Sequence, residues 1–346
     1  PAFLINSFIC CSFFVNMDYQ HLPKIELHLH LDCSLSYKVV QQIDPAVTYE
    51  DYCHSFVAPP HCTDLLDYLT RAVKGFELMQ TKEQLRLVTL DLFEQLKADN
   101  VIYAEIRFAP LLHLGKGLSP VEVVETVDAA FTEGKAMTGM EGGLILCTLR
   151  NYTEEQSLET VKLVQQFRGT NVLAFDMAGD EAGYPVAAHV KAFQFAKDNG
   201  IHCTCHAGEA KGPESVWDTL GQLHPTRIGH GVRSAEDEKL LDHLVKKDIH
   251  LEICPTSNIQ TNIFRSIEQH AADKIYRHGV SMSINTDART VTPVTLSSEY
   301  NKLQDVFHWD KAHFLQCNLE GIRHSFTTEA VKQKIAARIQ EAYNNC

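Results

Sequence analysis

The chain has 346 residues, of which 45% are hydrophobic and 22% are charged, a composition typical of a folded globular protein. This composition excludes a largely disordered chain, which would be poorer in apolar residues. Lys and Arg number 31 against 44 Asp and Glu, so the formal net charge is −13 and the overall field repels a nucleic-acid backbone, whereas a small neutral substrate is unaffected.

Eleven cysteines are scattered without a repeated spacing, in a chain too long to need a disulfide framework. We interpret them as mostly reduced thiols, which predicts a cytoplasmic protein. Residues 1–16 are apolar but lack Lys and Arg, so they match a secretory signal poorly, and they are shorter than the ~20 residues of a membrane-spanning helix. We therefore expect residues 1–16 to be a flexible or artefactual extension, with secretion as the minority alternative, and residues 17–346 to form a single domain without a membrane role.

The first predicted element is a strand over residues 24–32, where apolar and polar residues alternate. His28 and His30 fall on one face of this strand, close enough together to bind the same metal ion. A histidine pair at this spacing also occurs on solvated strand faces. The apolar residues of the opposite face favour a buried strand, in which two unpaired imidazoles would be costly.

Residues 34–99 are predicted to be mainly helical, with a loop around 58–60. Strand and helix patterns then alternate. Further strands are predicted at 102–108, 144–149, 172–177, 202–206, 227–229, 250–254 and 281–286. Helices are predicted at 121–137, 154–167, 187–199, 213–222, 235–247 and 264–278. Eight strands, each followed by helical sequence, predict an α/β protein that is a (β/α)8 TIM barrel with extra helices inserted after the first strand, rather than a doubly wound sheet.

The fifth predicted strand ends in a histidine and a carboxylate three residues apart, His206 and Glu209. An imidazole nitrogen suits a divalent transition metal, and a nearby glutamate that does not bind the metal can transfer a proton. A buried histidine followed by a helix-capping glutamate explains this short stretch equally well when it is taken alone. Polar residues at the other strand ends favour the metal-binding interpretation.

Two more polar residues follow predicted strands: His230 lies between two glycines, and Asp287 comes directly after the eighth strand. Their alternatives are a core histidine and a helix N-cap. In barrels the active site lies at the carboxyl ends of the strands, which is where these candidates fall. A set of three imidazoles and one carboxylate suits Zn²⁺ and leaves room for a water, whose pKa zinc lowers to about 7. Its members are His28, His30, His206 and Asp287.

A further pair, His250 and Glu252, has the His-x-Glu spacing of cytidine-type zinc deaminases. No Pro-Cys-x-x-Cys sequence follows this pair. We therefore reject this second zinc motif.

Six short stretches, taken together and in this order, resemble the adenosine deaminase family of metal-dependent amidohydrolase barrels. They are 26–32 (ELHLHLD), 175–181 (FDMAGDE), 206–209 (HAGE), 229–231 (GHG), 252–255 (EICP) and 285–287 (NTD). The resemblance extends from about residue 22 to about residue 325. It implies hydrolytic deamination of adenosine and 2′-deoxyadenosine to inosine and 2′-deoxyinosine, a reaction of purine salvage.

The resemblance also implies a role for each candidate residue. Glu209 would donate a proton to purine N1, and His230 would orient or deprotonate the attacking water. Asp32 would contact the ribose 5′-hydroxyl, and the Gly179 backbone would contact purine N3. One zinc ion per chain would be bound by the four residues His28, His30, His206 and Asp287.

Two positions depart from the family pattern: Cys33 stands where glycine is usual, and Ala288 replaces an aspartate that contacts purine N7. Three alternatives therefore stay open. The first is a deaminase of another 6-aminopurine, such as adenine, N6-methyl-AMP or an aminofutalosine-like nucleoside. The others are an amidohydrolase that opens an amide or ester ring, and a binding protein without activity, which the presence of both Glu209 and His230 disfavours.

Overall fold

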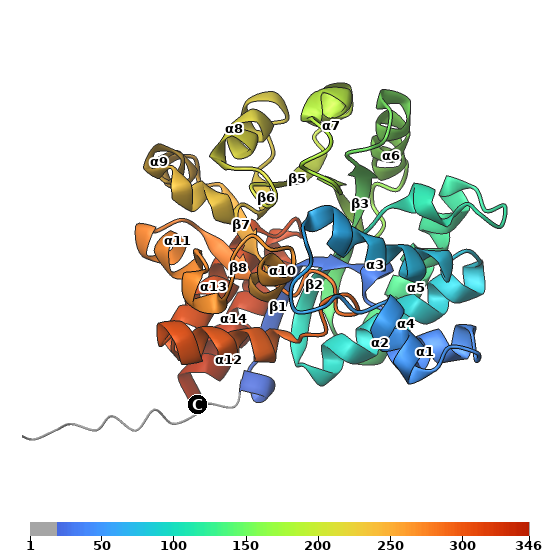
Figure 1. Cartoon of the computed structure of the whole chain (residues 1–346), viewed down its shortest axis with the longest axis horizontal. Coiled ribbons are helices and arrows are strands. Elements are labelled where there is room, and N and C mark those ends of the chain that lie inside the picture. The colour runs from blue at the N-terminus through green and yellow to red at the C-terminus, as the bar shows by residue number, and fades with distance from the viewer. Residues whose placement is uncertain (1–18, 346) are drawn as a thin grey trace, which may run out of the picture.

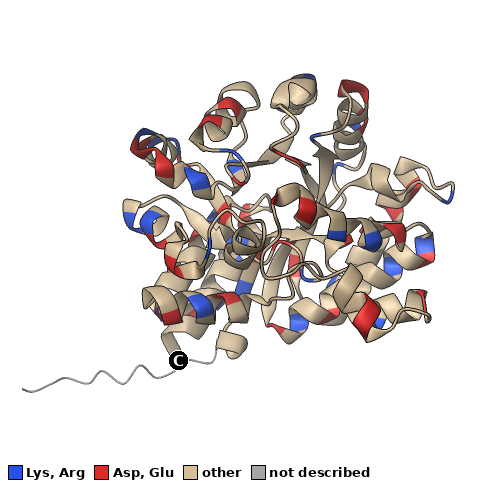
Figure 2. Ribbon diagram, in the orientation of Figure 1, with Lys and Arg blue, Asp and Glu red and all other residues tan. Residues whose placement is uncertain are grey.

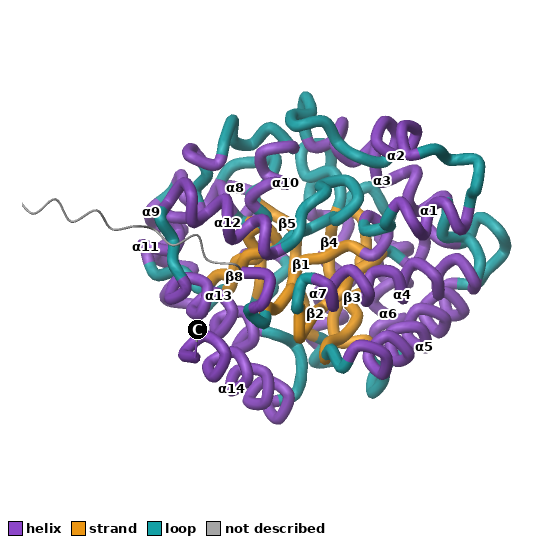
Figure 3. The backbone as a smooth tube through the Cα atoms, turned by 90° about the horizontal axis from the view of Figure 1, so that it is seen from below, coloured by secondary structure: helices purple, strands orange, loops and turns teal. Residues whose placement is uncertain are grey.

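The computed structural model describes residues 19–345, so our expectation for residues 1–16 lies outside the described part of the chain. Eight parallel strands pair in sequence order and form a central barrel enclosed by helices (Figures 1 and 3). The strands are β1 (Lys24–His30), β2 (Val101–Phe108), β3 (Glu141–Leu149), β4 (Val172–Ala178), β5 (His202–Ala207), β6 (Arg227–His230), β7 (His250–Ile253) and β8 (Met282–Ile284). The predicted (β/α)8 barrel is confirmed, and each predicted strand is present.

The barrel closes just beyond β8. There the Asp287 N–H donates to the His28 carbonyl at 2.9 Å, and the Asp287 carbonyl accepts from the His30 N–H at 2.7 Å. A parallel bridge joins Leu29 to Asp287 at the same place. These contacts, which we call the closing seam, align the backbones of three predicted metal ligands.

The outer helices follow the strands as predicted. They are α4 (Lys82–Ala98), α5 (Pro120–Thr138), α6 (Glu154–Gln166), α7 (Val190–Asp198), α8 (Pro213–Gln222), α9 (Glu238–Lys247) and α11 (Ala272–His278). Local sequence signals set their ends: Ser119 and Glu122 form a capping box at the start of α5, and Gly139 ends it in the left-handed conformation.

The predicted insertion after β1 is also present. It consists of α1 (Tyr37–Ile43), α2 (Tyr49–Ser55) and α3 (Leu65–Glu77), which precede α4. In Figure 1, α3 lies across the front of the barrel, beside the short helix α10 (Pro255–Gln260). The α3 side chains Leu65, Tyr68 and Leu69 line the cavity at the strand ends.

Two expectations are corrected in detail. Residues 264–278 do not form one helix, because only α11 is α-helical and a 3-10 turn at Ile267–Gln269 precedes it. His270 between them is extended, and its side chain is buried and accepts a hydrogen bond from the Ala272 N–H at 3.1 Å. The first strand also ends earlier than residue 32, since Leu31–Cys33 forms a 3-10 turn.

Three C-terminal helices complete the barrel in a region for which the sequence patterns above make no prediction. They are α12 (Leu296–Phe307), α13 (Lys311–His324) and α14 (Glu329–Asn345). Helix α13 packs against the closing strands, where Asn318 Oδ1 accepts from the Ile25 N–H at 2.9 Å.

The surface and the helices carry two further findings. Among residues 19–345, no helix has the length and the apolar character that crossing a membrane requires. In the view of Figure 2, basic and acidic residues are interspersed over the outer helices, and no helix there is dominated by Lys and Arg.

Candidate active site

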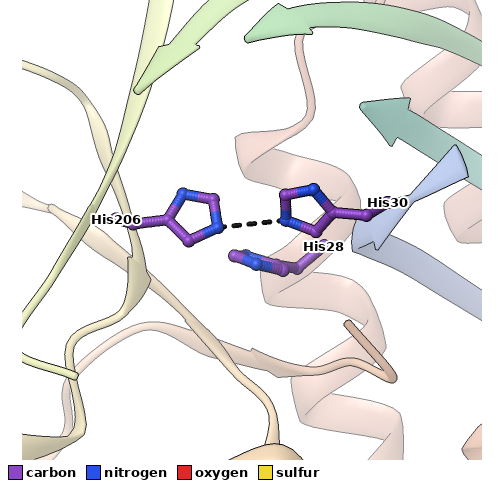
Figure 4. Close-up of side chains that lie close together, drawn as sticks. All are labelled: His28, His30 and His206. Carbon is purple, nitrogen blue, oxygen red and sulfur yellow. Dashed lines mark hydrogen bonds between the residues drawn. The ribbon is translucent and has the colours of Figure 1, made fainter. Parts of the chain in front are cut away.

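Three imidazoles converge at the carboxyl end of the barrel, His28 and His30 from β1 and His206 from β5 (Figure 4). The Nε2 atoms of His30 and His206 are 3.1 Å apart, and the ligand atoms of all three residues lie within 4.8 Å of one another. Asp287 Oδ1 lies 3.4 Å from His28 Nε2 and 3.6 Å from His30 Nε2. The structure therefore brings together the four residues predicted to bind zinc.

This donor set fits a divalent cation. His28 Nε2 is buried and has no hydrogen-bond partner within the described chain, although a buried polar atom normally has one. A cation among three imidazoles and a carboxylate would satisfy this atom. A second group, His28, His230 and Cys254, is as compact. It fits less well, because burial raises the pKa of the Cys254 thiol well above its usual value and keeps it protonated.

Two carboxylates orient the imidazoles from behind. Glu252 Oε2 lies 2.7 Å from His28 Nδ1, and Asp176 Oδ1 lies 3.3 Å from His206 Nδ1, which is also 3.1 Å from the Met177 carbonyl. These acceptors place the ring proton on Nδ1, so that the lone pair of Nε2 points into the cluster, as metal binding requires. Glu252 thus has a supporting role that sequence analysis did not assign to it, since Glu252 was considered only within the rejected zinc motif and the stretch 252–255.

Burial keeps two of the imidazoles in the protonation state that suits a metal. Desolvation lowers the pKa of both His30 and His206, so their rings are neutral. Burial alone would raise the pKa of Asp287, but the adjacent imidazoles, His28 among them, hold this pKa well below the usual range. Ser257 Oγ donates to Asp287 Oδ2 at 2.7 Å, which leaves Oδ1 facing the histidines.

The backbone is strained where two site residues enter the cluster. His230 and Asp287 have φ values of 59° and 65°, in the left-handed region that residues other than glycine rarely adopt. Such strain costs on the order of 1–3 kcal/mol and is concentrated at functional sites. Gly229 provides space beside them, because a Cβ atom there would lie 2.7 Å from His28 Cε1.

Glu209 lies beside the cluster, with Oε2 at 3.6 Å from His230 Nε2. Its side chain is buried, and desolvation, together with the charges of Asp287 and Glu181, raises its pKa well above the usual value. This direction favours the protonated carboxyl group, which is the state that a proton donor requires.

Glu181 is a supporting residue that sequence analysis missed. Its carboxylate accepts from four consecutive backbone N–H groups, those of residues 208–211, at 2.6–3.0 Å, and from Ser215 Oγ. These bonds fix the loop that carries Glu209. The only available signal was the position of Glu181 at the end of the stretch 175–181, because nothing in the local pattern indicates a partner loop.

Two adjoining cavities open at the strand ends. The inner one, of about 420 Å³ including its opening, is lined by His206, Glu209, His230 and Asp287 among others. The outer one is about 1080 Å³ and includes Asp32, while His30, Cys33 and Gly179 line both.

Asp32 is buried at the edge of the outer cavity, where its Oδ2 accepts from the Ala109 N–H at 3.2 Å. Burial raises the pKa of Asp32 to about 6. The two departures from the family pattern are both at the cavities, since Ala288 lines the inner one. Arg289 does not replace the missing carboxylate or reach the cavity, because its guanidinium is 3.0 Å from Asp99 Oδ2.

Comparison with known proteins gives consistent results. The family model "Adenosine deaminase" matches residues 23–342. A protein of Clostridium acetobutylicum named adenosine deaminase is 35% identical over 92% of this chain and 97% of its own length. The crystal structure of Arabidopsis ADAL complexed with IMP is 26% identical, with a TM-score of 0.85 over 94% of this chain and 98% of that one.

An adenine deaminase structure from Arthrobacter aurescens has a TM-score of 0.86 at 23% identity, over 92% of this chain and 98% of that one, which supports the barrel fold alone. The family match and the bacterial relative each cover more than nine-tenths of the chain. On this evidence the chain belongs to the adenosine deaminase family.

Proposed function

We propose that this protein is a zinc-dependent deaminase that converts adenosine and 2′-deoxyadenosine, with water, to inosine and 2′-deoxyinosine and ammonia. The observation that carries the proposal is a buried Glu209 beside a cluster of three imidazoles and a carboxylate. Membership of the family supports the choice of a 6-aminopurine nucleoside as substrate.

The metal would be held by four residues, His28, His30, His206 and Asp287. When bound, zinc would supply the Lewis acidity that makes a water molecule nucleophilic at neutral pH. Metal analysis of the purified protein should find about one equivalent of zinc per chain. Two tightly bound ions would contradict a site with a single metal.

The chain's own residues would carry the proton transfers. Glu209 would protonate purine N1, which makes C6 electrophilic, and water would then add at C6. The C6–N6 bond breaks and ammonia leaves, so that C6 becomes a carbonyl. The backbone of Gly179 would contact N3, and Asp32 would accept a hydrogen bond from the ribose 5′-hydroxyl.

We further propose that nucleosides are preferred to nucleotides. Asp32 would repel a 5′-phosphate, and like charges about 4 Å apart cost on the order of 4 kcal/mol near a protein surface. Among the described residues that line the outer cavity there is no Lys or Arg, whereas Leu66, Leu69 and Phe76 are apolar. This lining offers no cation to a phosphate.

Ammonia release from adenosine, adenine, AMP and N6-methyl-AMP, measured side by side on one zinc-loaded preparation, tests this assignment. We expect the highest kcat/KM for adenosine. The missing contact at Ala288 removes a charged hydrogen bond, worth roughly 1.5–3 kcal/mol, so adenosine turnover below the family norm is compatible with the proposal. A nucleotide or a free base that reacts faster than adenosine would contradict it.

We also propose a reducing, cytoplasmic setting and a single domain over residues 17–346. The eight cysteines within the described residues are all free, and four strands contribute to one continuous inner cavity rather than to separate sites. Persistence of these thiols after purification without reductant, measured by thiol titration, tests the first point.

A further inference from the structure

A chain of hydrogen bonds leads from the backbone of α11 to His230. The Ala272 N–H donates to His270 Nδ1 at 3.1 Å, and His270 Nε2 lies 3.2 Å from Asn258 Oδ1. Asn258 Nδ2 in turn lies 3.2 Å from His230 Nδ1. The three side chains are buried, and neither Asn258 nor His270 lines the inner or the outer cavity. Both residues therefore act on the site through His230.

The Ala272 N–H, at one end of this series of hydrogen bonds, determines which atom donates in each of them. A peptide N–H can only donate, so His270 Nδ1 is an acceptor and the proton of the neutral ring is on Nε2. That proton is donated to Asn258 Oδ1, and the amide group of Asn258 therefore faces His230. If the amide group of Asn258 faced His270 instead, His270 Nε2 would have to accept and the ring proton would be on Nδ1. That proton would then face the Ala272 N–H, which is also a donor. Burial lowers the pKa of His270 to about 3, so this ring is neutral.

We propose that Asn258 and His270 are positioning residues that hold His230 as the neutral tautomer with its proton on Nε2. The amide of Asn258 donates to Nδ1, which leaves Nε2–H as the group that points into the inner cavity, 3.6 Å from Glu209 Oε2. His230 then serves as a hydrogen-bond donor to the oxygen that attacks C6, and not as a base. This reaction role, unlike the tautomer itself, rests on the proposed function.

The proton balance follows from this tautomer. Nε2 already carries its proton, and Nδ1 is occupied by the Asn258 amide, so neutral His230 has no site for a proton from water. Glu209 first gives its proton to purine N1, and its emptied carboxylate is placed to take the proton that water loses as the C6–O bond forms. The same carboxyl group then passes a proton to N6 as the C6–N6 bond breaks, and ammonia leaves. The Glu209 carboxylate takes the remaining hydroxyl proton as C6 becomes a carbonyl, so Glu209 ends protonated as it began.

The tautomer can be observed without any turnover. Long-range ¹H–¹⁵N correlation spectra of the zinc-loaded enzyme, labelled with ¹⁵N-histidine, distinguish a protonated Nε2 from a protonated Nδ1. The signals of His230 are assigned by their loss in His230→Gln. We expect the proton on Nε2, and a proton on Nδ1 would overturn the inference.

Substitutions at Asn258 and at His270 test this series of hydrogen bonds. Asn258→Asp keeps an acceptor toward His270 but replaces the donor toward His230, so we expect the proton of His230 to move to Nδ1. The kcat for adenosine should then fall about 10²-fold or more, as for the loss of one donor in a preorganised site, while KM stays within a few-fold and zinc content is unchanged. A reversed tautomer with unchanged kcat would contradict the donor role.

Two variants of His270 separate a positioning role from a role in packing alone. In His270→Gln the side-chain amide can still donate to Asn258, so kcat should stay within a few-fold of the parent, whereas His270→Phe should lose activity as Asn258→Asp does. Equal losses in both variants would contradict a positioning role. His250→Gln is the matched control, because His250 is equally buried but bonds only to Ser281 and Ser283.

The outcomes for the two proposals differ. An enzyme that shows the Nε2 proton but releases no ammonia from adenosine refutes the proposed function and leaves the tautomer in place. An enzyme that deaminates adenosine with the proton on Nδ1 refutes this inference alone.

Discussion

Two polar regions lie next to each other inside the barrel and differ in how their charges are paired. The first, which we call the buried charge network, consists of Glu105, Arg107, Asp176, Arg227 and Glu252, all fully buried. Its carboxylates and guanidinium groups meet at 2.6–2.9 Å. The second is the site cluster of histidines with Asp287 and Glu209, in which His28 Nε2 has no hydrogen-bond partner and two residues have a strained backbone.

This difference indicates a division of roles. A buried charge is retained only when an opposite charge pairs with it, because an unpaired buried charge is very costly. Each charge of the network has such a partner, whereas in the site cluster the carboxylates of Asp287 and Glu209 face imidazoles. The two regions are joined where Glu252 and Asp176 contact the Nδ1 atoms of His28 and His206. The paired charges of the network therefore hold the histidines of the site cluster in place.

The largest effect should come from breaking the charge network. Arg107→Met leaves Asp176 and Glu252 without their shared cation, and we expect a loss of about 3–5 kcal/mol in the free energy of unfolding, measured in urea. Arg86→Met is the control, because Arg86 forms an exposed pair with Glu133 that is worth about 0.2–1 kcal/mol. Similar losses for both variants would show that the network contributes no more than a surface pair.

The next effect concerns the cluster alone. Glu209→Gln removes a proton donor without removing a metal ligand, so kcat should fall by about 10²-fold or more while zinc content and thermal stability are retained. Glu214→Gln, at an exposed position just beyond the same loop, should leave kcat unchanged. Turnover of Glu209→Gln within a few-fold of the parent would rule out the role given to Glu209.

A smaller effect should appear where the cluster meets the backbone. Gly229→Ala places a Cβ 2.7 Å from His28 Cε1 and 3.3 Å from His206 Cγ, which displaces both rings. We expect zinc affinity, measured by competition with a chelator, to fall about 10–100-fold, the range typical of changes that disturb ligand orientation. Gly221→Ala in α8 is the matched control, because no atom lies within 4 Å of its Cβ position. Unchanged affinity in Gly229→Ala would show that the rings can move without cost.

The smallest effect should come from Glu181, whose charge acts on the pKa of Glu209. The negative charge of Glu181 contributes to the raised pKa of Glu209, so Glu181→Gln lowers that pKa. The protonated donor is lost as the pH rises through its pKa, so the alkaline limb of the kcat profile should move to lower pH, by less than about one unit. Asp180→Asn, at the adjacent residue, should leave the limb in place. A shift to higher pH in Glu181→Gln would contradict the electrostatic role.

Much of the barrel could be predicted because its strands and helices have distinct local periods. The predicted site residues could be placed together because parallel strands end at one face, which is where His28, His206 and Asp287 meet. Pairing across the barrel could not be predicted. Glu252 on β7 supports His28 on β1, and these strands are not hydrogen-bonded neighbours.

The backbone conformation of two site residues could not be predicted either. Nothing in the local pattern indicates that His230 and Asp287 adopt positive φ values, since only tertiary contacts compensate such strain. The predicted helix over 264–278 failed for a related reason. His270 is turned inward by its contact with Asn258, and this long-range bond overrides local helix propensity.

The closing seam would make a bound metal a reporter of complete folding. Three of the four proposed ligands lie on β1 and on the segment beyond β8, so a partly synthesised chain that ends before Asp287 lacks one of them and the edge that aligns two others. Bringing such distant segments together has a high entropic cost and is completed late. An ion that binds only the closed ring adds stability by mass action, about 4.1 kcal/mol at a free concentration 1,000 times its Kd. A chain without the proposed ion would therefore lack this added stability at the closing seam.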